Sequence, residues 1–193
     1  MKVGLFFGSF NPIHVGHLVI ANHIAEYSDL DQVWFVVTPH SPFKTKSSLL
    51  DNYQRLEMVY RATQDYTKLK PSDIEFNLPQ PNYTINTLVH LQEKYPDHTF
   101  ALIMGEDNLK SFHKWKNYEL ILEDHHLYIY PRKSQGAIET QFHQNPKVHF
   151  TDAPIMELSS TFIRQSIKAG KLVKPMLPEH VWDYLDEMNF YKQ

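Results

Sequence analysis

The sequence of 193 residues contains no cysteine, and no stretch of it approaches the roughly 18 apolar residues of a membrane-spanning helix. The absence of cysteine excludes disulfides, thiolate zinc sites and cysteine nucleophiles, and it is typical of proteins in a reducing compartment. The N-terminal apolar run follows a single Lys2 and is interrupted at Gly8, which argues against a targeting segment. We therefore expect a cytoplasmic protein with no membrane partner.

The sequence also lacks an excess of charge of one sign. Its 19 basic and 22 acidic side chains give a formal net charge of -3, so no global field draws the protein onto nucleic acid or an anionic membrane. We expect no nucleic-acid partner, and any phosphate that binds must be held by local groups. The length and the 42% hydrophobic content predict a single domain over residues 1–193.

Short apolar segments alternate with longer amphipathic ones along the chain. The short segments are rich in β-branched and aromatic residues, as buried parallel strands are; they cover residues 2–8, 32–38, 99–105, 126–132 and 147–152. The amphipathic segments predict helices over residues 15–27, 51–65, 84–95 and 116–123, followed by a final pair within 159–170 and 178–191. This order predicts an α/β fold: a Rossmann-like, doubly wound, mostly parallel sheet with helices on both faces and a small C-terminal helical part.

Two common phosphate-binding motifs are absent, because the six glycines form neither GxGxxG nor GxxxxGK[ST]. A hydride-transferring Rossmann enzyme and a P-loop kinase are therefore disfavoured. The first strand-to-helix turn, GSFNPIHVGH, instead places His14 and His17 one helical turn apart at a helix N-terminus, where imidazoles and free amides can bind phosphate. Gly8 and Gly16 remove side chains beside them, so a ligand can approach. The alternative, half of a metal site, lacks a nearby third ligand in the sequence.

Several ordered blocks resemble one known family. The stretch GSFNPIHVGH is similar to the HxGH signature of the nucleotidyltransferase superfamily, whose members move a nucleoside monophosphate from ATP or CTP to an acceptor. Within it, the sequence most resembles the bacterial nicotinate mononucleotide adenylyltransferases, through PHSPFK (39–44), YQRLEM (53–58), NYTINTL (82–88), IMGEDNLKSFHKW (103–115) and ELSSTFIRQSIKAGK (157–171). Three positions depart from the family pattern: Ser9 replaces a threonine, Asn11 an aspartate, and Phe43 a common histidine beside Lys44.

The resemblance implies an ATP site between a core of residues 1–155 and C-terminal helices of residues 156–193. It assigns catalytic roles to His14, His17, Lys44 and Arg164, and it adds Gly8, Ser9, Phe10, Gly16, Gly105, Ser159, Ser160 and Thr161 as ATP-binding residues. One indication is independent of the family. A cation in the first turn of a helix opposes the helix dipole, so Arg164 suggests an anion nearby. The alternative is that Ser159, Ser160 and Thr161 only cap the helix and that Arg164 is solvated.

The resemblance also implies a site for the acceptor nucleotide. Trp115 stacks on the nicotinate ring, Asp107 accepts from a ribose hydroxyl, and further contacts come from Ser9, Lys44, Tyr83, Thr84, Thr87 and Arg132. Trp115 is flanked by two lysines and lies outside an apolar periodicity, which favours an aromatic platform over a core position. For Asp107 and Thr84 the alternative role is helix capping, and for Arg132 it is a surface position.

We expect the reaction to make nicotinate adenine dinucleotide and pyrophosphate from ATP and nicotinate mononucleotide. A phosphate monoester has a second pKa of about 6, so the acceptor needs no general base at neutral pH. Mg²⁺ is expected to bind mainly through the ATP phosphates, with no protein ligands. The alternatives are an adenylyltransferase acting on phosphopantetheine and a nucleotide-sensing module without turnover. The oligomeric state is expected to be a monomer or a small homo-oligomer.

Overall fold

A computed structural model describes residues 1–39, 49–133 and 141–192. Six strands form one sheet in the order β3-β2-β1-β4-β5-β6, and all paired neighbours in these ranges are parallel. The strands are β1 (Lys2–Gly8), β2 (Gln32–Val37), β3 (Leu69–Ser72), β4 (Thr99–Gly105), β5 (Leu127–Tyr130) and β6 (Val148–Phe150). This strand order reverses direction between β1 and β4, as in a doubly wound nucleotide-binding fold. The predicted Rossmann-like α/β architecture is confirmed.

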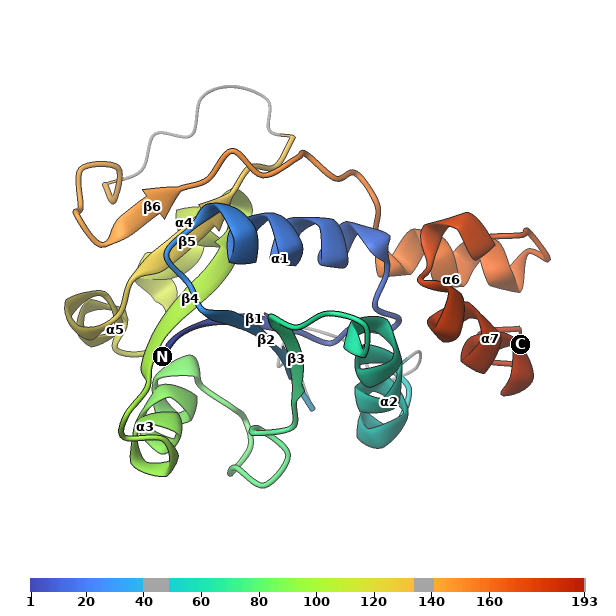
Figure 1. Ribbon diagram of the computed structural model, residues 1–193, viewed down its shortest axis with the longest axis horizontal. Coiled ribbons are helices and arrows are strands. Elements are labelled where there is room, and N and C mark those ends of the chain that lie inside the picture. The colour runs from blue at the N-terminus through green and yellow to red at the C-terminus, as the bar shows by residue number, and fades with distance from the viewer. Residues whose placement is uncertain (40–48, 134–140, 193) are drawn as a thin grey trace.

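The strands are apolar on both faces because helices cover both faces of the sheet (Figure 1). Along β1, Val3 and Leu5 enter one buried cluster while Phe6 enters the other, which is the alternation that a pleated strand requires. The helices of the first cluster are α1 (Val15–Tyr27), α2 (Asn52–Thr63), α6 (Ser160–Lys168) and α7 (Glu179–Glu187). Those of the second are α3 (Thr84–Lys94), α4 (Glu106–Ser111) and α5 (Tyr118–Asp124). No helix of the described ranges is long and apolar enough to cross a membrane.

One strand and one α-helix of the described ranges were not predicted from the sequence. Strand β3 has the sequence LKPS, which is short and only partly apolar, and it pairs with β2 on one side only. An edge position tolerates Pro71 because the missing N–H is not needed by a second neighbour. Helix α4 has only six residues and follows β4 without a connecting loop, so no helical periodicity marks it. The predicted helix over residues 116–123 begins two residues later, after Asn117 in the left-handed region (φ 53°).

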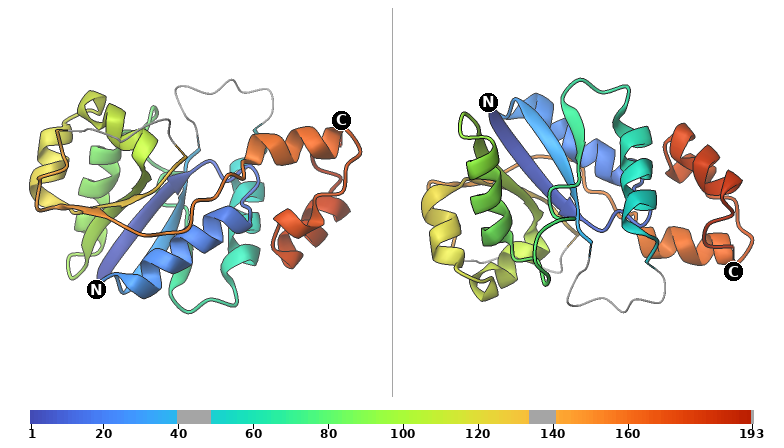
Figure 2. Two further views of the ribbon diagram at one scale, coloured as in Figure 1. Left: turned by 90° about the horizontal axis from the view of Figure 1, so that it is seen from above. Right: turned by 90° about the horizontal axis from the view of Figure 1, so that it is seen from below.

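The C-terminal part contains the two predicted helices, α6 and α7, joined through the 3₁₀ turn η3 (Lys174–Met176). Gly170, just beyond α6, has φ 69°, a left-handed conformation that suits glycine after a helix. Helix α7 packs on α2 (Figures 1 and 2). Leu185 of α7 and Phe190 beyond it are buried within this single chain.

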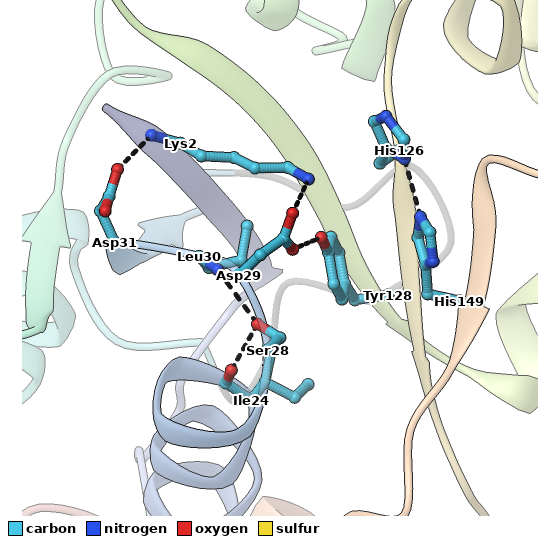
Figure 3. Close-up of polar contacts among 9 residues, drawn as sticks. All are labelled: Lys2, Ile24, Ser28, Asp29, Leu30, Asp31, His126, Tyr128 and His149. Carbon is cyan, nitrogen blue, oxygen red and sulfur yellow. Dashed lines mark hydrogen bonds and ion pairs between the residues drawn. The ribbon is translucent and has the colours of Figure 1, made fainter.

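A polar cluster ties the sheet together at the edge where the strands begin (Figure 3). The Lys2 ammonium donates to Asp29 Oδ2 at 2.6 Å, and the Tyr128 hydroxyl donates to the other oxygen of the same carboxylate. Nearby, His126 Nδ1 lies 2.7 Å from His149 Nε2. These contacts join β1, the loop after α1, β5 and β6 at the edge opposite the carboxyl ends of the strands.

Candidate active site

The turn between β1 and α1 lies at the carboxyl end of β1, next to the point where the strand order reverses. Phe10 takes a left-handed conformation there (φ 44°), and its ring is buried 5.2 Å from the ring of His17 and 5.4 Å from that of Phe35. A Cβ on Gly8 would lie 2.8 Å from the Phe10 ring. The space beside Gly8 is therefore filled by Phe10, whereas the sequence had suggested room for a ligand.

Side chains from distant elements hold three carbonyl oxygens of this turn. The bonds are Arg55 Nη1 to Ser9 O (2.6 Å), Arg164 Nη1 to Asn11 O (2.7 Å) and Ser160 Oγ to Pro12 O (2.9 Å). Because α2 and α6 supply these donors, both helices fix the conformation of the turn. These three carbonyl oxygens point toward donors of the protein. Because the C=O groups of the turn are held in this way, its N–H groups are left to bind an anion.

His14 and His17 form a stacked pair at the start of α1. Their ring centroids are 3.7 Å apart with an interplanar angle of 23°. The backbone N–H of His14 donates to His17 Nδ1 at 3.3 Å, so neutral His17 carries its proton on Nε2 and that nitrogen is a donor. Burial, and next the charge of Arg132, lower the pKa of His14 to about 4. His14 is therefore neutral at pH 7, and its Nδ1 is buried with no hydrogen-bond partner in the described part of the chain.

These histidines face a cavity of about 450 Å³, which is a typical size for a small-molecule site. Its lining comes from the β1–α1 turn, α1, the segments before α2 and after β5, and the segment that leads into α6: Ser9, Asn11, His14, Gly16, His17, Ile20, Leu49, Arg132, Met156, Leu158, Ser159, Ser160, Thr161 and Arg164. The described lining includes two arginines and no carboxylate. Such a lining suits a polyanion.

The start of α6 supplies the side of the cavity opposite α1. Ser159 caps the helix, since its Oγ accepts from the backbone N–H of Phe162 at 3.1 Å. Arg164 is partly buried and is not simply solvated, because it also donates through Nη2 to Thr161 Oγ1 at 3.4 Å. The segment that leads from β6 into α6 runs beside α1 (Figure 2), and a Cβ on Gly16 would lie 3.5 Å from Met156 of that segment. Two helix N-termini therefore meet at one cavity, an arrangement with two sets of free amides for phosphate.

Apart from Ser9, which follows β1, the described residues expected to bind the acceptor lie around the ends of β4 and β5 and the starts of α3 and α4. Among these described residues, Ser9 and Arg132 line the cavity. Arg132 connects the two regions, because its Nε lies 3.9 Å from Asp107 Oδ1. A Cβ on Gly105 would meet both side chains, at 2.4 Å from the Asp107 oxygen and 3.2 Å from Arg132 Nε. Gly105 thus permits the approach of Arg132 and Asp107.

Four of the expected acceptor residues differ in their exposure to solvent. Trp115 and Thr84 are partly exposed and Tyr83 is exposed, whereas Thr87 is buried. Trp115 is half-buried against Phe112, with ring centroids 5.4 Å apart, and the ammonium of the adjacent Lys116 lies over the Tyr83 ring at 4.5 Å. Thr84 begins α3. Thr87 is fully buried and donates from Oγ1 to Glu75 at 2.8 Å. Thr87 therefore has no exposed surface, and its hydroxyl is held by Glu75.

Arg55 was interpreted from the sequence as a packing residue of an amphipathic helix, and the structure shows a further role. It is fully buried, and besides Ser9 it donates to the carbonyls of Thr38, Pro39 and Leu50 and to Asn52 Oδ1. Burial lowers the pKa of Arg55, yet a guanidinium stays charged in proteins. The signal in the sequence was an arginine on the apolar face shared with Met58, Val59 and Ala62, because a charge on a buried face requires partners.

Two predictions concern residues or ions that the described structure does not contain. Lys44, with Phe43, lies outside the described residues. In the described ranges, no group of three or more His, Asp or Glu side chains could hold a metal ion.

Comparison with known proteins gives consistent matches over nearly the whole chain. A cytidylyltransferase-like family model matches residues 5–166. Proteins named probable nicotinate-nucleotide adenylyltransferase are 65% identical in Flavobacterium johnsoniae, over all of both chains, and 66% identical in Christiangramia forsetii, over 99% of this chain and 98% of that protein. The solved Plasmodium falciparum nicotinic acid mononucleotide adenylyltransferase complexed with NaAD has a TM-score of 0.81 at 19% identity, covering 99% of this chain and 97% of its own. At that identity the likeness shows the fold alone.

Proposed function

The chain belongs to the cytidylyltransferase-like family and to its nicotinate-nucleotide adenylyltransferases, and we propose that it transfers the adenylyl group of ATP to nicotinate mononucleotide. The products are nicotinate adenine dinucleotide and pyrophosphate, a step of NAD synthesis. The observation that carries this proposal is the cavity where the stacked histidines at the start of α1 meet the N-terminus of α6, with two arginines and no carboxylate in its described lining. The family names of relatives that match from end to end supply the acceptor.

The chemistry needs positioning and charge stabilisation more than proton transfer. A phosphate oxygen of the mononucleotide attacks the α-phosphorus of ATP and forms the new P–O bond, while the bond from the α-phosphorus to the bridging oxygen breaks and pyrophosphate leaves. The attacking phosphate is already a dianion at neutral pH, which fits a site where His14 is neutral and is not needed as a base. The residues must align the reactants and stabilise the charge that develops on the transferred group.

We assign His17 Nε2–H as a donor to the phosphate that is transferred, because its Nδ1 accepts the backbone N–H of His14. His14, held beneath it in the stack, supplies a second neutral imidazole. Its pKa rises when a phosphate is adjacent, since an opposite charge favours the protonated ring. Arg164 and the first amides of α6 bind the phosphates from the other side of the cavity. Lys44 keeps its predicted catalytic role, and Mg²⁺ enters as the MgATP substrate.

The acceptor site extends from Arg132 toward β4. Asp107 and Arg132, connected across Gly105, are the candidates for ribose and phosphate contacts. Tyr83, Thr84 and Trp115 are the candidates for the nicotinate pocket, and Thr87 supports it by its bond to Glu75. Burial raises the pKa of Glu75, while its hydrogen bonds, among them the one from Thr87, oppose that shift. The cytoplasmic location and the oligomeric state stay predictions.

Pyrophosphate release from MgATP tests the proposal, with nicotinate mononucleotide, nicotinamide mononucleotide and phosphopantetheine offered in separate reactions and the products identified by mass. We expect turnover with nicotinate mononucleotide and a product of the mass of nicotinate adenine dinucleotide. Faster turnover with phosphopantetheine would contradict the acceptor. Binding of ATP without turnover of any of the three would contradict the enzymatic function and favour the sensing module.

A further inference from the structure

Beyond α7 the chain turns back toward the start of α1 and α6. Asn189 and Tyr191 both have positive φ values, 52° and 64°, in the left-handed region that non-glycine residues enter only at a steric cost. Phe190 between them is buried, and its ring packs edge-on against Tyr184 with centroids 5.5 Å apart. The anchored Phe190 and the two left-handed residues determine where the Tyr191 side chain lies.

The Tyr191 hydroxyl reaches the β1–α1 turn. It donates to Asn11 Oδ1 at 2.6 Å, and the same oxygen accepts the backbone N–H of Leu50 at 3.3 Å. Asn11 is buried and lines the cavity, and its backbone oxygen accepts from Arg164 Nη1 at 2.7 Å. One asparagine therefore joins the third residue from the C-terminus to the arginine that faces the cavity.

The protonation states suit this contact. Burial raises the pKa of Tyr191, and the smaller opposing effects come from the positive charges of Arg164 and then Arg55. The phenol is therefore a neutral donor throughout the physiological pH range. Two donors converge on the side-chain oxygen of Asn11, so they fix which end of the amide faces Tyr191 and Leu50.

We propose that Tyr191 is a positioning residue for adenylyl transfer, because its hydroxyl fixes Asn11 and Asn11 in turn fixes the guanidinium of Arg164 at the phosphate cavity. This inference rests on the proposed function, in which Arg164 binds the phosphates of ATP. Tyr191 itself touches the turn and not the substrate. Its loss therefore affects the reaction through the orientation of Arg164.

The variant Tyr191→Phe tests the proposal, since it removes one oxygen and keeps the ring that packs near the core. We expect kcat/KM for ATP to fall about fivefold to tenfold, the equilibrium factor of one hydrogen bond, while KM for nicotinate mononucleotide stays unchanged. The matched control is Tyr27→Phe at the exposed end of α1, where the tyrosine is 80% exposed, and it should behave as the wild type. A thermal melt of each variant reports whether folding is intact.

A double-mutant cycle with Arg164→Lys separates positioning from general stabilisation. If Tyr191 acts through Arg164, the double variant loses no more kcat/KM for ATP than Arg164→Lys alone, because the shared contact is already broken. If the two losses multiply, Tyr191 acts independently of Arg164 and the proposal is overturned.

Calorimetric binding of a non-hydrolysable ATP analogue separates this proposal from the proposed function. Weaker binding by Tyr191→Phe supports the positioning role even if the wild type fails to use nicotinate mononucleotide, a failure that would contradict only the function. Equal analogue binding and equal kcat/KM for ATP in Tyr191→Phe and the wild type would overturn the positioning role, whatever the acceptor.

Discussion

Replacing Arg55 by methionine should destabilise the protein by about 3–5 kcal/mol, which is the usual cost of breaking a buried charge network by removing one partner. Methionine fills a similar elongated space but donates no hydrogen bond. Arg55 is 0% exposed, and its donors satisfy acceptors after β1, after β2 and before α2. The substitution therefore leaves several buried acceptors without a donor at once.

The magnitude follows from the individual bonds. Arg55 donates to Ser9 O at 2.6 Å, to Thr38 O at 2.9 Å and to Leu50 O at 3.0 Å, whereas the contact to Pro39 O at 3.5 Å is weak. A buried acceptor that loses its partner costs about 1–3 kcal/mol. Removing the guanidinium also removes the free-energy cost of burying its charge, and this gain offsets part of the lost stability. The net destabilisation is therefore about 1 kcal/mol for each lost bond.

Urea unfolding followed by circular dichroism measures the loss, and Arg61→Met on the same helix is the matched control. Arg61 is partly exposed and pairs with Glu57 at 2.6 Å, so its loss should cost about 1 kcal/mol or less. For a chain of this length each kcal/mol lowers Tm by about 2–4 °C, so Arg55→Met should melt at least about 6 °C below the wild type. If the two variants lose equal stability, Arg55 does not hold these loops together.

Two further predictions concern the two edges of the sheet. His17→Ala should lower kcat by about a hundredfold or more through loss of a donor to the phosphate, with Tm nearly unchanged, as pyrophosphate release and a thermal melt will show; near-wild-type turnover would remove His17 from the mechanism. Hydrogen bonds from Lys2 and then Tyr128 lower the pKa of Asp29 from 3.8 to about 2. Its stabilising contribution is therefore present above pH 3.8 and is lost as the pH falls through about 2. Because the Asp29 side chain is 67% exposed, Asp29→Asn should cost under about 1 kcal/mol at pH 7 and should flatten the decline in unfolding free energy over that acid range.

The elements of the fold and the residue proximities that were predicted correctly depend on residues close together in the sequence. Helix α1 was predicted with its observed bounds because its apolar face and the turn before it lie within one short segment. The proximity of His14 and His17 follows from their spacing of three residues at a helix start. The β1–α1 turn and the end of β5 lie close together because the strands are parallel, so their carboxyl ends share one edge of the sheet. Strand β3 was missed because its four residues carry neither alternation nor an apolar run.

The contacts that hold the turn rigid could not be predicted in the same way, because each joins segments that are far apart in the chain. Ser9 and Arg55 are 46 residues apart, Asn11 and Arg164 153, and Asn11 and Tyr191 180. A phosphate site requires fixed N–H groups, and fixing them requires donors for the carbonyl oxygens of the same turn. The sequence shows that Arg55 sits on an apolar helical face and therefore needs acceptors, but not which acceptors. Tyr191 lacks even that signal, since a tyrosine near a terminus is equally suited to an exposed position. If Tyr191→Phe and Arg55→Met both weaken ATP binding while Arg61→Met does not, these distant donors are part of the phosphate site as much as the histidines that the motif identifies.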